Sequence, residues 1–350
     1  AIQSTLQTPF RERTNRAVAL RESGINLTTT ASYDHEAVRA LVADIAAYVT
    51  RDPVDAQIQS FDYATRTFSF TESQPGVTLD QDLLYERVTA ALDRWESGVT
   101  VTVDPIVTEP AVTKDELVAS FGLVAAYTTE TTNDSNRNTN IDLACQAING
   151  TALMPGETFS FNQATGQRTT EKGYKSAGAI AAGQSIEEVG GGICQVSSTL
   201  FNAVARANLE IVSRSPHAWP STYVNIGEDA TVNWPNLDFQ FKNNTKSPIF
   251  IITYYKNRRM SAEIWGMSLG EGVTIDLQST IIKTIDPPSE VKYELNTDLP
   301  YGTEKTTVKA RTGYVVETEK VWYKDGQETR RELLHTSNYR AYQQVIEYNY

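Results

Sequence analysis

The chain has 350 residues, with 31 Lys and Arg against 43 Asp and Glu, and a net charge of -12 at pH 7. This length exceeds what one hydrophobic core usually serves, so two or three domains are expected. The acidic balance argues against nucleic acid as a partner, because phosphate binding needs clustered Lys and Arg. No run of about 18 apolar residues occurs, so no segment is predicted to span a membrane, and no signal peptide is recognised.

The first part of the chain is expected to form a polar lead-in over residues 1–30 and a small α+β domain over residues 31–110. A helix is predicted after Asp34, a plausible N-cap, because apolar residues then recur at helical spacing. Those residues are Val38, Leu41, Val42, Ile45 and Val49.

A hairpin and a second helix follow within the same predicted domain. Alternating residues over 56–61 and 67–70 predict a β-hairpin, and Pro75–Gly76 predicts a turn. A second amphipathic helix is expected over residues 79–95, because its leucines and valines fall at helical spacing. Residues 99–103 alternate as another strand.

A middle α+β domain, of the type that carries catalysis, is predicted over residues 115–266. A polar loop is expected over Asn133–Asn138, followed by a helix from about Asn140 to Asn149. Cys145 lies on the apolar face of that helix and is expected to be a small buried side chain. Cys145 and Cys194 can pair in principle, but two cysteines make no disulfide framework. The glycine-rich surroundings of Cys194 favour a reactive thiol instead.

The last part of the chain, over residues 272–350, is predicted to be a small all-β module. It alternates in short β-type runs, and Asp325–Gly326 is a strong hairpin turn. His335 is expected to be a surface or strand residue. The fold class expected for the whole chain is therefore α+β and multidomain.

The segment around Cys194 suits nucleophilic acyl transfer. Three glycines precede it, and glycine tolerates positive φ and close backbone approach. Apolar residues at helical spacing predict a helix beginning close to Cys194, with Ser197 and Ser198 helping to cap its first turn. A helix N-terminus favours a thiolate. The backbone N–H of Cys194 or Gln195 would hold a developing oxyanion.

His217 is the candidate general base. The chain has three histidines, and the other two, His35 and His335, fall in other predicted domains. His217 lies between two prolines, in a stretch that cannot form a long helix. A third group should orient the imidazole, and Asp229 is the first choice and Asp238 the second.

The stretch over residues 154–265 resembles the VanW family, named after an accessory protein of vancomycin-resistance clusters. The phrases GGGICQVSSTLFNA and DATVNWPNLDFQFKNNT carry the resemblance. It implies a class of L,D-transpeptidase in which Cys194 is the nucleophile. Residues 213–215 and Ala218 depart from the wording common in the family, which leaves the substrate contacts near His217 in doubt. The cysteine, histidine and aspartate are kept.

The flanking parts resemble two other families. RDPVDAQIQSFD, PGVTLDQDLLYERVTAAL and VTVDPIVTEPAVT resemble the peptidoglycan-binding domain found ahead of some L,D-transpeptidase and VanW domains. The stretch KARTGYVVETEKVWYKDGQETRRELLHTSNYRAYQQVIEYN resembles the five-glycine β module of bacterial surfaces, although it keeps few of those glycines. Both resemblances imply a place at the cell wall.

A further group of residues near the cysteine and histidine is expected to contact the substrate. Arg214 offers a planar fork for a stem-peptide carboxylate, and a solvated surface Arg is the alternative. No metal-ligand spacing and no nucleotide-binding fingerprint occurs, so no metal or organic cofactor is implied. The expected substrate-contacting residues are Gly191, Gly192, Gln195, Arg214 and Asp238.

Two functions of different class remain open. In the first, the protein is a peptidoglycan L,D-transpeptidase, a transferase that forms 3–3 cross-links between stem peptides through a thioester on Cys194, with His217 moving the proton. In the second, it is a non-catalytic cell-wall or glycopeptide-binding accessory protein, whose glycine loop and helix N-terminus bind a carboxylate. Both expect peptidoglycan stem peptides and glycan as partners. Both place the protein in a Gram-positive-type cell wall or on the outer face of the cytoplasmic membrane, held through an anchor outside this chain.

Overall fold

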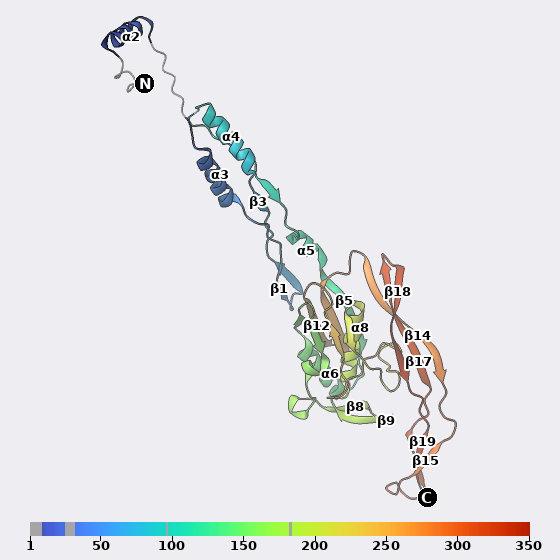
Figure 1. Ribbon diagram of the computed structural model, residues 1–350. Helices are drawn as coiled ribbons and strands as arrows, with labels where there is room; N and C mark the ends of the chain where they lie inside the picture. The colour runs from blue at the N-terminus through green and yellow to red at the C-terminus, as the bar shows by residue number, and fades with distance from the viewer. Residues whose placement is uncertain (1–8, 25–31, 96, 182–183) are drawn as a thin grey trace. The chain divides into compact units, whose positions relative to one another are not determined.

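The computed structural model describes residues 9–24, 32–95, 97–181 and 184–350 (Figure 1). The chain divides into two units. One comprises Ala1–Val54 and Gln74–Ala111, and the other comprises Asp55–Ser73 and Val112–Tyr350. Within the described ranges, no helix is long and apolar enough to cross a membrane.

The described residues of the first unit contain the helices α2 (Phe10–Ser23), α3 (His35–Val49) and α4 (Gln81–Asp93). The predicted N-cap is confirmed, because the Asp34 carboxylate accepts hydrogen bonds from the first backbone amides of α3. Helix α3 packs against α4 through its buried face, which includes Val42. Helix α2 lies in the expected lead-in and buries none of its residues among the described parts of the chain. The sequence did not predict this helix, because its residues are mostly polar and show no apolar periodicity.

The strands of the first unit differ from the prediction. Strand β3 (Gly76–Thr78) pairs antiparallel with β4 (Ile106–Thr108), whereas residues 99–103 form no strand. Alternation predicts extended chain, but it does not specify which residues find a pairing partner. The expected turn at Pro75–Gly76 is also wrong, because Gly76 begins a strand. A Cβ there would lie 2.6 Å from Cδ of Pro53, so the position favours glycine through close packing.

The predicted hairpin is confirmed as β1 (Ile58–Asp62) and β2 (Thr67–Phe70). It belongs to the second unit, not with the helices α3 and α4 as expected. The reason is an aromatic cluster: the ring centroid of Phe61 lies 4.8 Å from that of Phe250 and 5.7 Å from that of Trp265. Burying these rings together outweighs the closeness in sequence to the helices.

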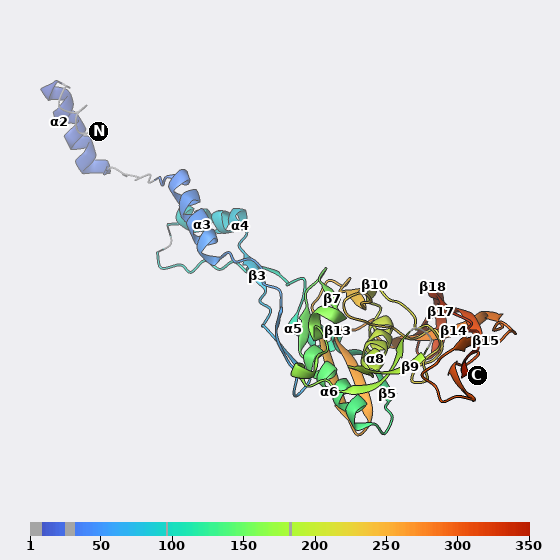
Figure 2. The ribbon, with the colours of Figure 1, turned by 90° about the horizontal axis from the view of Figure 1, so that it is seen from below.

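A four-stranded antiparallel sheet forms the centre of the second unit, in the order β5-β13-β12-β6. Helices α6 and α8 pack against it and against each other (Figures 1 and 2). The main hydrophobic core lies between these helices and the sheet. The elements are β5 (Phe121–Glu130), α6 (Ser135–Ile148), β6 (Thr151–Leu153), α8 (Ile193–Arg206), β12 (Ile249–Lys256) and β13 (Arg259–Met267).

Helix α6 begins inside the polar stretch that was expected to be a loop. The Asp134 carboxylate accepts a hydrogen bond from the amide of Arg137 and caps the helix, so Ser135 is already helical. Asp and Asn favour helix caps as well as loops, and composition does not separate the two. Cys145 is 1% exposed, which confirms its prediction as a small buried residue.

Smaller elements surround this core. Strands β10, β11 and β7 form a three-stranded sheet, and β8 pairs with β9. Their bounds, with those of the short helices, are α5 (Lys114–Ser120), β7 (Thr158–Ser160), α7 (Phe161–Thr165), η1 (Thr170–Lys172), β8 (Ser176–Ala181), β9 (Gln184–Val189), β10 (Glu210–Ser213) and β11 (Gln240–Lys242).

The C-terminal part is all β, as predicted. One sheet has the order β14-β17-β18 and the other the order β15-β19-β16. Asp325 and Gly326 both have positive φ, at 51° and 79°, and make the tight turn between β17 and β18. The α+β class of the whole chain is confirmed. The strands are β14 (Val273–Ile285), β15 (Lys292–Leu295), β16 (Thr303–Val308), β17 (Gly313–Lys324), β18 (Gln327–Tyr339) and β19 (Val345–Asn349).

Candidate functional site

The glycine loop places Cys194 in the first turn of α8. Gly192 is the N-cap with φ 104°, in the left-handed region that favours glycine. Gly191 is required for space, since a Cβ there would lie 2.3 Å from the carbonyl O of Ala177. The side-chain amide of Asn140 donates to the carbonyl O of Gly191 at 2.9 Å and fixes the loop. The predicted helix start is confirmed.

Ser197 and Ser198 do not cap this helix, which corrects the expectation. Both serines lie beyond the first turn of α8, too far from its N-terminus to cap it. Their hydroxyls instead connect α8 to the segment after Asp229. Ser197 Oγ donates to the carbonyl O of Ala230 at 2.6 Å. Ser198 Oγ accepts from the amide of Ala230 at 2.9 Å and donates to the carbonyl O of Cys194 at 2.7 Å. The segment that carries Asp229 is thereby fixed to the helix that carries Cys194.

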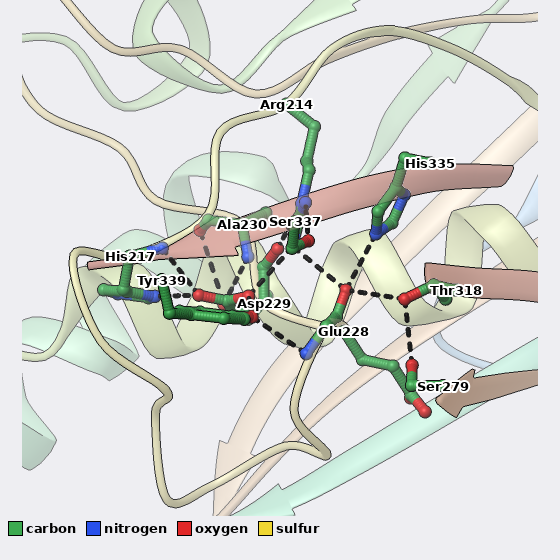
Figure 3. A network of polar contacts seen from close by, with 12 residues as sticks. Arg214, His217, Glu228, Asp229, Ala230, Ser279, Thr318, His335, Ser337 and Tyr339 are labelled. Carbon is green, nitrogen blue, oxygen red and sulfur yellow. Dashed lines mark hydrogen bonds and ion pairs between the residues drawn. The ribbon is translucent and has the colours of Figure 1, made fainter. Parts of the chain in front are cut away.

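Cys194, His217 and Asp229 are brought together. His217 is 6% exposed, and its Nδ1 donates to Asp229 Oδ2 at 2.5 Å (Figure 3). The backbone amide of His217 donates to the same oxygen at 2.7 Å. The imidazole lies close enough to the Cys194 thiol for each group to shift the pKa of the other, and the hydroxyl of Tyr223 lies 3.3 Å from Nε2. Sγ of Cys194 lies 3.4 Å from the carbonyl O of Val232.

These three groups shift one another's pKa values. Burial alone would raise the pKa of Cys194, but the hydrogen bond and positive charge of His217 outweigh burial and lower it. Burial acts to lower the pKa of His217, yet the hydrogen bonds with Asp229 and Cys194 raise it to about 9. Burial likewise opposes ionisation of Asp229, but His217 and Arg214 lower its pKa to about 2. At neutral pH these directions favour a thiolate beside an imidazolium.

Two residues of strand β18 complete the environment of Asp229. The Tyr339 hydroxyl donates to Asp229 Oδ1 at 2.6 Å and accepts from the amide of Gly227 at 2.8 Å. Arg214 Nη2 also donates to Asp229 Oδ1 at 2.8 Å, while its Nη1 donates to Ser337 Oγ at 2.6 Å. Figure 3 shows Asp229 among these groups. The C-terminal module therefore forms part of the site's surroundings.

The same module also contacts the loop that carries His217. The amide of Arg340 donates to the carbonyl O of Ala218 at 3.1 Å. The guanidinium of Arg311 lies 4.3 Å above the ring of Trp219, and Trp219 packs edge-on against Tyr342. His335, expected at the surface or on a strand, lies on β18 and is half-buried, with Nε2 2.8 Å from the carbonyl O of Gly227.

Arg214 does not reach the substrate region, which corrects the expectation of a carboxylate-binding arginine there. Its side chain is only 5% exposed. Besides the Asp229 carboxylate, it donates to the carbonyl O atoms of Asp229, at 2.5 Å, and Gly227, at 3.0 Å. All of these acceptors belong to the protein, so Arg214 holds the Asp229 loop in place.

Asp238 is also committed to structure. Its carboxylate accepts from Ser160 Oγ at 2.6 Å, from the amide of Asn162 at 2.9 Å and from the side chain of Gln240 at 2.8 Å. These bonds fix the start of α7. Asp238 neither orients His217 nor lines the cavity described below, so its predicted contact with substrate is not supported.

Gln195 has a structural role next to Cys194, because its backbone and side chain form hydrogen bonds within the protein. Its backbone N–H donates to the carbonyl O of Gly192 at 2.9 Å, so it is not the oxyanion donor. Its side chain donates to Thr129 Oγ1 and the carbonyl O of Glu130 and accepts from Arg137 Nη2 at 3.0 Å. The N–H of Cys194 has no protein acceptor within the described part of the chain, which leaves it as the candidate oxyanion donor.

A cavity of about 980 Å³ opens in front of Cys194 and His217. It has room for a short peptide. Three of its lining side chains, Arg168, Tyr223 and Trp234, were not predicted from the sequence. Each belongs to a loop or a short polar stretch with no pattern, and only the fold brings it to the cysteine.

Three family models match successive parts of the chain. Residues 136–265 match a family model described as "VanW like protein". Residues 1–100 match "Putative peptidoglycan binding domain", and residues 278–349 match "G5 domain".

Two curated proteins are similar to the chain. "Uncharacterized protein YoaR" of Bacillus subtilis is 32% identical over 299 residues, which cover 85% of this chain and 94% of that protein. "Vancomycin B-type resistance protein VanW" of Enterococcus faecalis is 33% identical over 115 residues, which cover 31% of this chain and 42% of that protein.

Among solved structures, "IgA1 Protease G5 domain structure" is 22% identical, with a TM-score of 0.15, and covers 22% of this chain and 92% of that one. The extent and level of identity to YoaR, together with the three domain matches, decide the family. The chain belongs to the VanW-like family and combines a VanW-like domain with an N-terminal domain of the peptidoglycan-binding type and a C-terminal G5 domain.

Proposed function

We propose that this protein is a cysteine-dependent L,D-transpeptidase that joins peptidoglycan stem peptides. The observation that carries the proposal is the arrangement of Cys194, His217 and Asp229 at one wall of a peptide-sized cavity. A thiol, a base and a group that orients the base are what thioester chemistry requires. The N-terminal domain match supports peptidoglycan as the substrate class and the cell wall as the place of action.

In the first step, the Cys194 thiolate attacks the carbonyl carbon that joins the third and fourth residues of a tetrapeptide stem. The N–H of Cys194, at the positive end of α8, stabilises the negative oxygen that develops. The C–N bond then breaks, and the leaving amine takes a proton from the His217 imidazolium. A thioester on Cys194 and a free terminal D-residue result.

In the second step, the side-chain amine of a neighbouring stem attacks the thioester. His217, neutral after the first step, accepts a proton from this amine. A new amide bond forms, and Sγ of Cys194 leaves as the thiolate. The site returns to its starting protonation state, and the product is a 3–3 cross-linked dimer. Asp229 keeps the imidazole in the orientation that both proton transfers need.

A non-catalytic wall-binding role is the second candidate. The observation that favours it is the character of the flanking domains, since one matches a peptidoglycan-binding model. The printed name of the relative VanW associates that protein with vancomycin resistance and specifies no reaction. In this alternative, the cavity holds a stem peptide without bond cleavage, and Cys194 stays unmodified.

Product analysis separates the two candidates. Purified protein is incubated with a defined tetrapeptide stem that carries a free side-chain amine, and the products are identified by mass spectrometry. We expect a 3–3 dimer and one free D-residue per bond formed. Cys194→Ala should yield neither product, and Cys145→Ala, the matched control at the buried cysteine, should yield both. Dimer formation by Cys194→Ala at the wild-type rate, or none by the wild type, contradicts the proposal.

A further inference from the structure

Buried polar atoms without a partner gather at the cavity. Nine buried side-chain nitrogen or oxygen atoms lack a hydrogen-bond partner within the described part of the chain. Six of the nine belong to residues that line this one cavity, so their distribution is far from random. Buried polar groups normally find partners, because an unmade bond costs stability. The six atoms belong to Thr131, Arg137, Arg168, Ser221 and Thr231.

Arg168 contributes two of these atoms, Nη1 and Nη2. Its guanidinium lies 5.6 Å from the centre of the Phe161 ring, which leaves its edge for hydrogen bonding. The stem of the side chain lies against the glycine loop, because a Cβ on Gly190 would be 3.0 Å from Cβ of Arg168. Burial lowers the pKa of Arg168, as expected for a cation removed from water.

No carboxylate forms an ion pair or a hydrogen bond with Arg168 within the described residues, although the charge of Asp238 acts on it from a greater distance. Of the acidic residues that line the cavity, Glu130 forms an ion pair with Arg259 at 3.1 Å. Asp134 caps α6, and Glu188 is exposed. A guanidinium fork buried without a carboxylate partner is suited to an anionic ligand.

Arg137 adds a second cation next to the glycine loop. A Cβ on Gly192 would lie 2.7 Å from Cγ of Arg137. Its guanidinium donates to neutral acceptors, the side chain of Gln195 at 3.0 Å and the carbonyl O of Gly178 at 3.4 Å, and its Nε has no partner within the described residues. The loop that leads into Cys194 is therefore close to two arginines, neither of which forms an ion pair with an acid within the described residues.

We propose that Arg168, assisted by the charge of Arg137, binds the terminal carboxylate of the peptide whose amide bond faces Cys194. This inference rests on the proposed function, in which the fourth residue of the stem is the leaving residue. In that residue, only one Cα separates the scissile nitrogen from the carboxylate, so the carboxylate must lie within a few ångströms of the attacked carbon. The subsite thus selects acyl donors that end in a free carboxylate directly after the scissile bond.

The test compares a tetrapeptide stem that has a free C-terminal carboxylate with the same peptide as its C-terminal carboxamide. Binding is measured by calorimetry to the Cys194→Ala protein, which cannot turn either peptide over. We expect the carboxylate peptide to bind about tenfold more tightly or better, since a charged bidentate hydrogen bond is lost in the amide. When Arg168→Gln is made in the Cys194→Ala protein, this preference should disappear. Only the carboxylate peptide should bind more weakly than before. Arg168→Lys in the same background should keep part of the preference for the carboxylate peptide.

The matched control is Arg331→Gln, in the exposed β17–β18 hairpin, which should keep the full preference. Equal binding of the two peptides, binding of neither, or a preference that survives Arg168→Gln overturns the subsite. Turnover by the wild-type protein is measured separately with both peptides. A carboxylate preference without turnover keeps the subsite and rejects the transpeptidase. Turnover with equal kcat/KM for the two peptides rejects the subsite and keeps the transpeptidase.

Discussion

The two sides of the His217 imidazole differ in how well their polar groups are satisfied. On the Asp229 side, the carboxylate accepts bonds from His217, Arg214 and Tyr339, and all three groups are buried or nearly so. On the cavity side, the guanidinium of Arg168 has no partner for either terminal nitrogen within the described residues. The first side is built to hold one geometry in the absence of substrate, and the second to interact with a ligand.

Two arginines show the same contrast. Arg214 and Arg168 both lie in polar stretches of the same domain. From the sequence, Arg214 was the residue predicted to contact the substrate. The structure buries Arg214 against Asp229, whereas Arg168 lines the cavity. An arginine that is already paired positions other residues, and an unpaired one is available for recognition.

The largest effect is expected for the substitution of Asp229, the carboxylate on the hydrogen-bonded side of the His217 imidazole. Asp229→Asn leaves Arg214 buried without its anion, and losing one partner of a buried ion pair costs about 3–5 kcal/mol. The imidazole also loses the acceptor that fixes its orientation, which should reduce turnover about 10³–10⁴-fold. Urea denaturation and the dimer-forming assay measure the two effects. A variant as stable as the wild type contradicts the account of this side.

His217→Gln should change the titration of Cys194 next most strongly. In the wild-type protein the pKa of Cys194 is lowered, so alkylation by iodoacetamide should reach half its maximum below the pH of about 8.5 typical of free cysteine. The variant loses the cation while burial, which raises the pKa, remains. Its curve should move to higher pH by about one unit or more.

Turnover in the wild-type protein adds a second check on the same pair. Because the pKa of His217 is raised to about 9, turnover should fall as pH rises through that value and the imidazolium loses its proton. Superimposable alkylation curves for wild type and His217→Gln exclude His217 as the partner of the thiol.

A smaller effect is expected from the C-terminal module. Tyr339→Phe removes one hydrogen bond to the Asp229 carboxylate and should cost about 1–3 kcal/mol of stability. Because the pKa of Asp229 is about 2, the carboxylate stays ionised near neutral pH without this bond, so the alkylation curve of Cys194 should not move. Tyr293→Phe, at an exposed tyrosine of the same module, is the control and should change neither quantity. If the two variants behave alike, the module does not position Asp229.

The last effect concerns His335 and is confined to acidic pH. Burial and the charge of Arg214 lower its pKa to about 4, below the ordinary value near 6.5 in the unfolded chain. The unfolded state therefore binds more protons between these values, and stability should be lost as pH falls from about 6.5 through 4. His335→Gln should flatten this dependence by about 1–3 kcal/mol at the acid end. Equal slopes of Tm against pH for the two proteins would count against a neutral, buried His335.

Some of this site could be predicted from the sequence, and the reasons are local. The three glycines and the helical spacing after them located the start of α8, and His217 stood out as the histidine that shares a predicted domain with Cys194. The pairing of β1 with β2 was likewise visible in the alternation. In each case neighbouring residues contain the information.

The remainder depends on contacts between distant segments. Tyr339 is 110 residues from Asp229 and lies in a module that was predicted as a separate part of the chain. Arg168 and Arg214 differ only in what the fold places beside them. The aromatic cluster that takes β1 and β2 to the second unit joins residues that are almost 200 positions apart. No spacing rule applies at such separations.

The central claim, that Cys194 is an acylated nucleophile, is tested most directly by intact-mass analysis. The protein is incubated with a tetrapeptide stem whose side-chain amine is blocked, so that no acceptor is present, and is quenched in acid. We predict a mass increase equal to the peptide without its terminal residue, located on Cys194 by digestion and absent from Cys194→Ala. An unmodified wild-type protein, or the same adduct on Cys194→Ala, would contradict the claim.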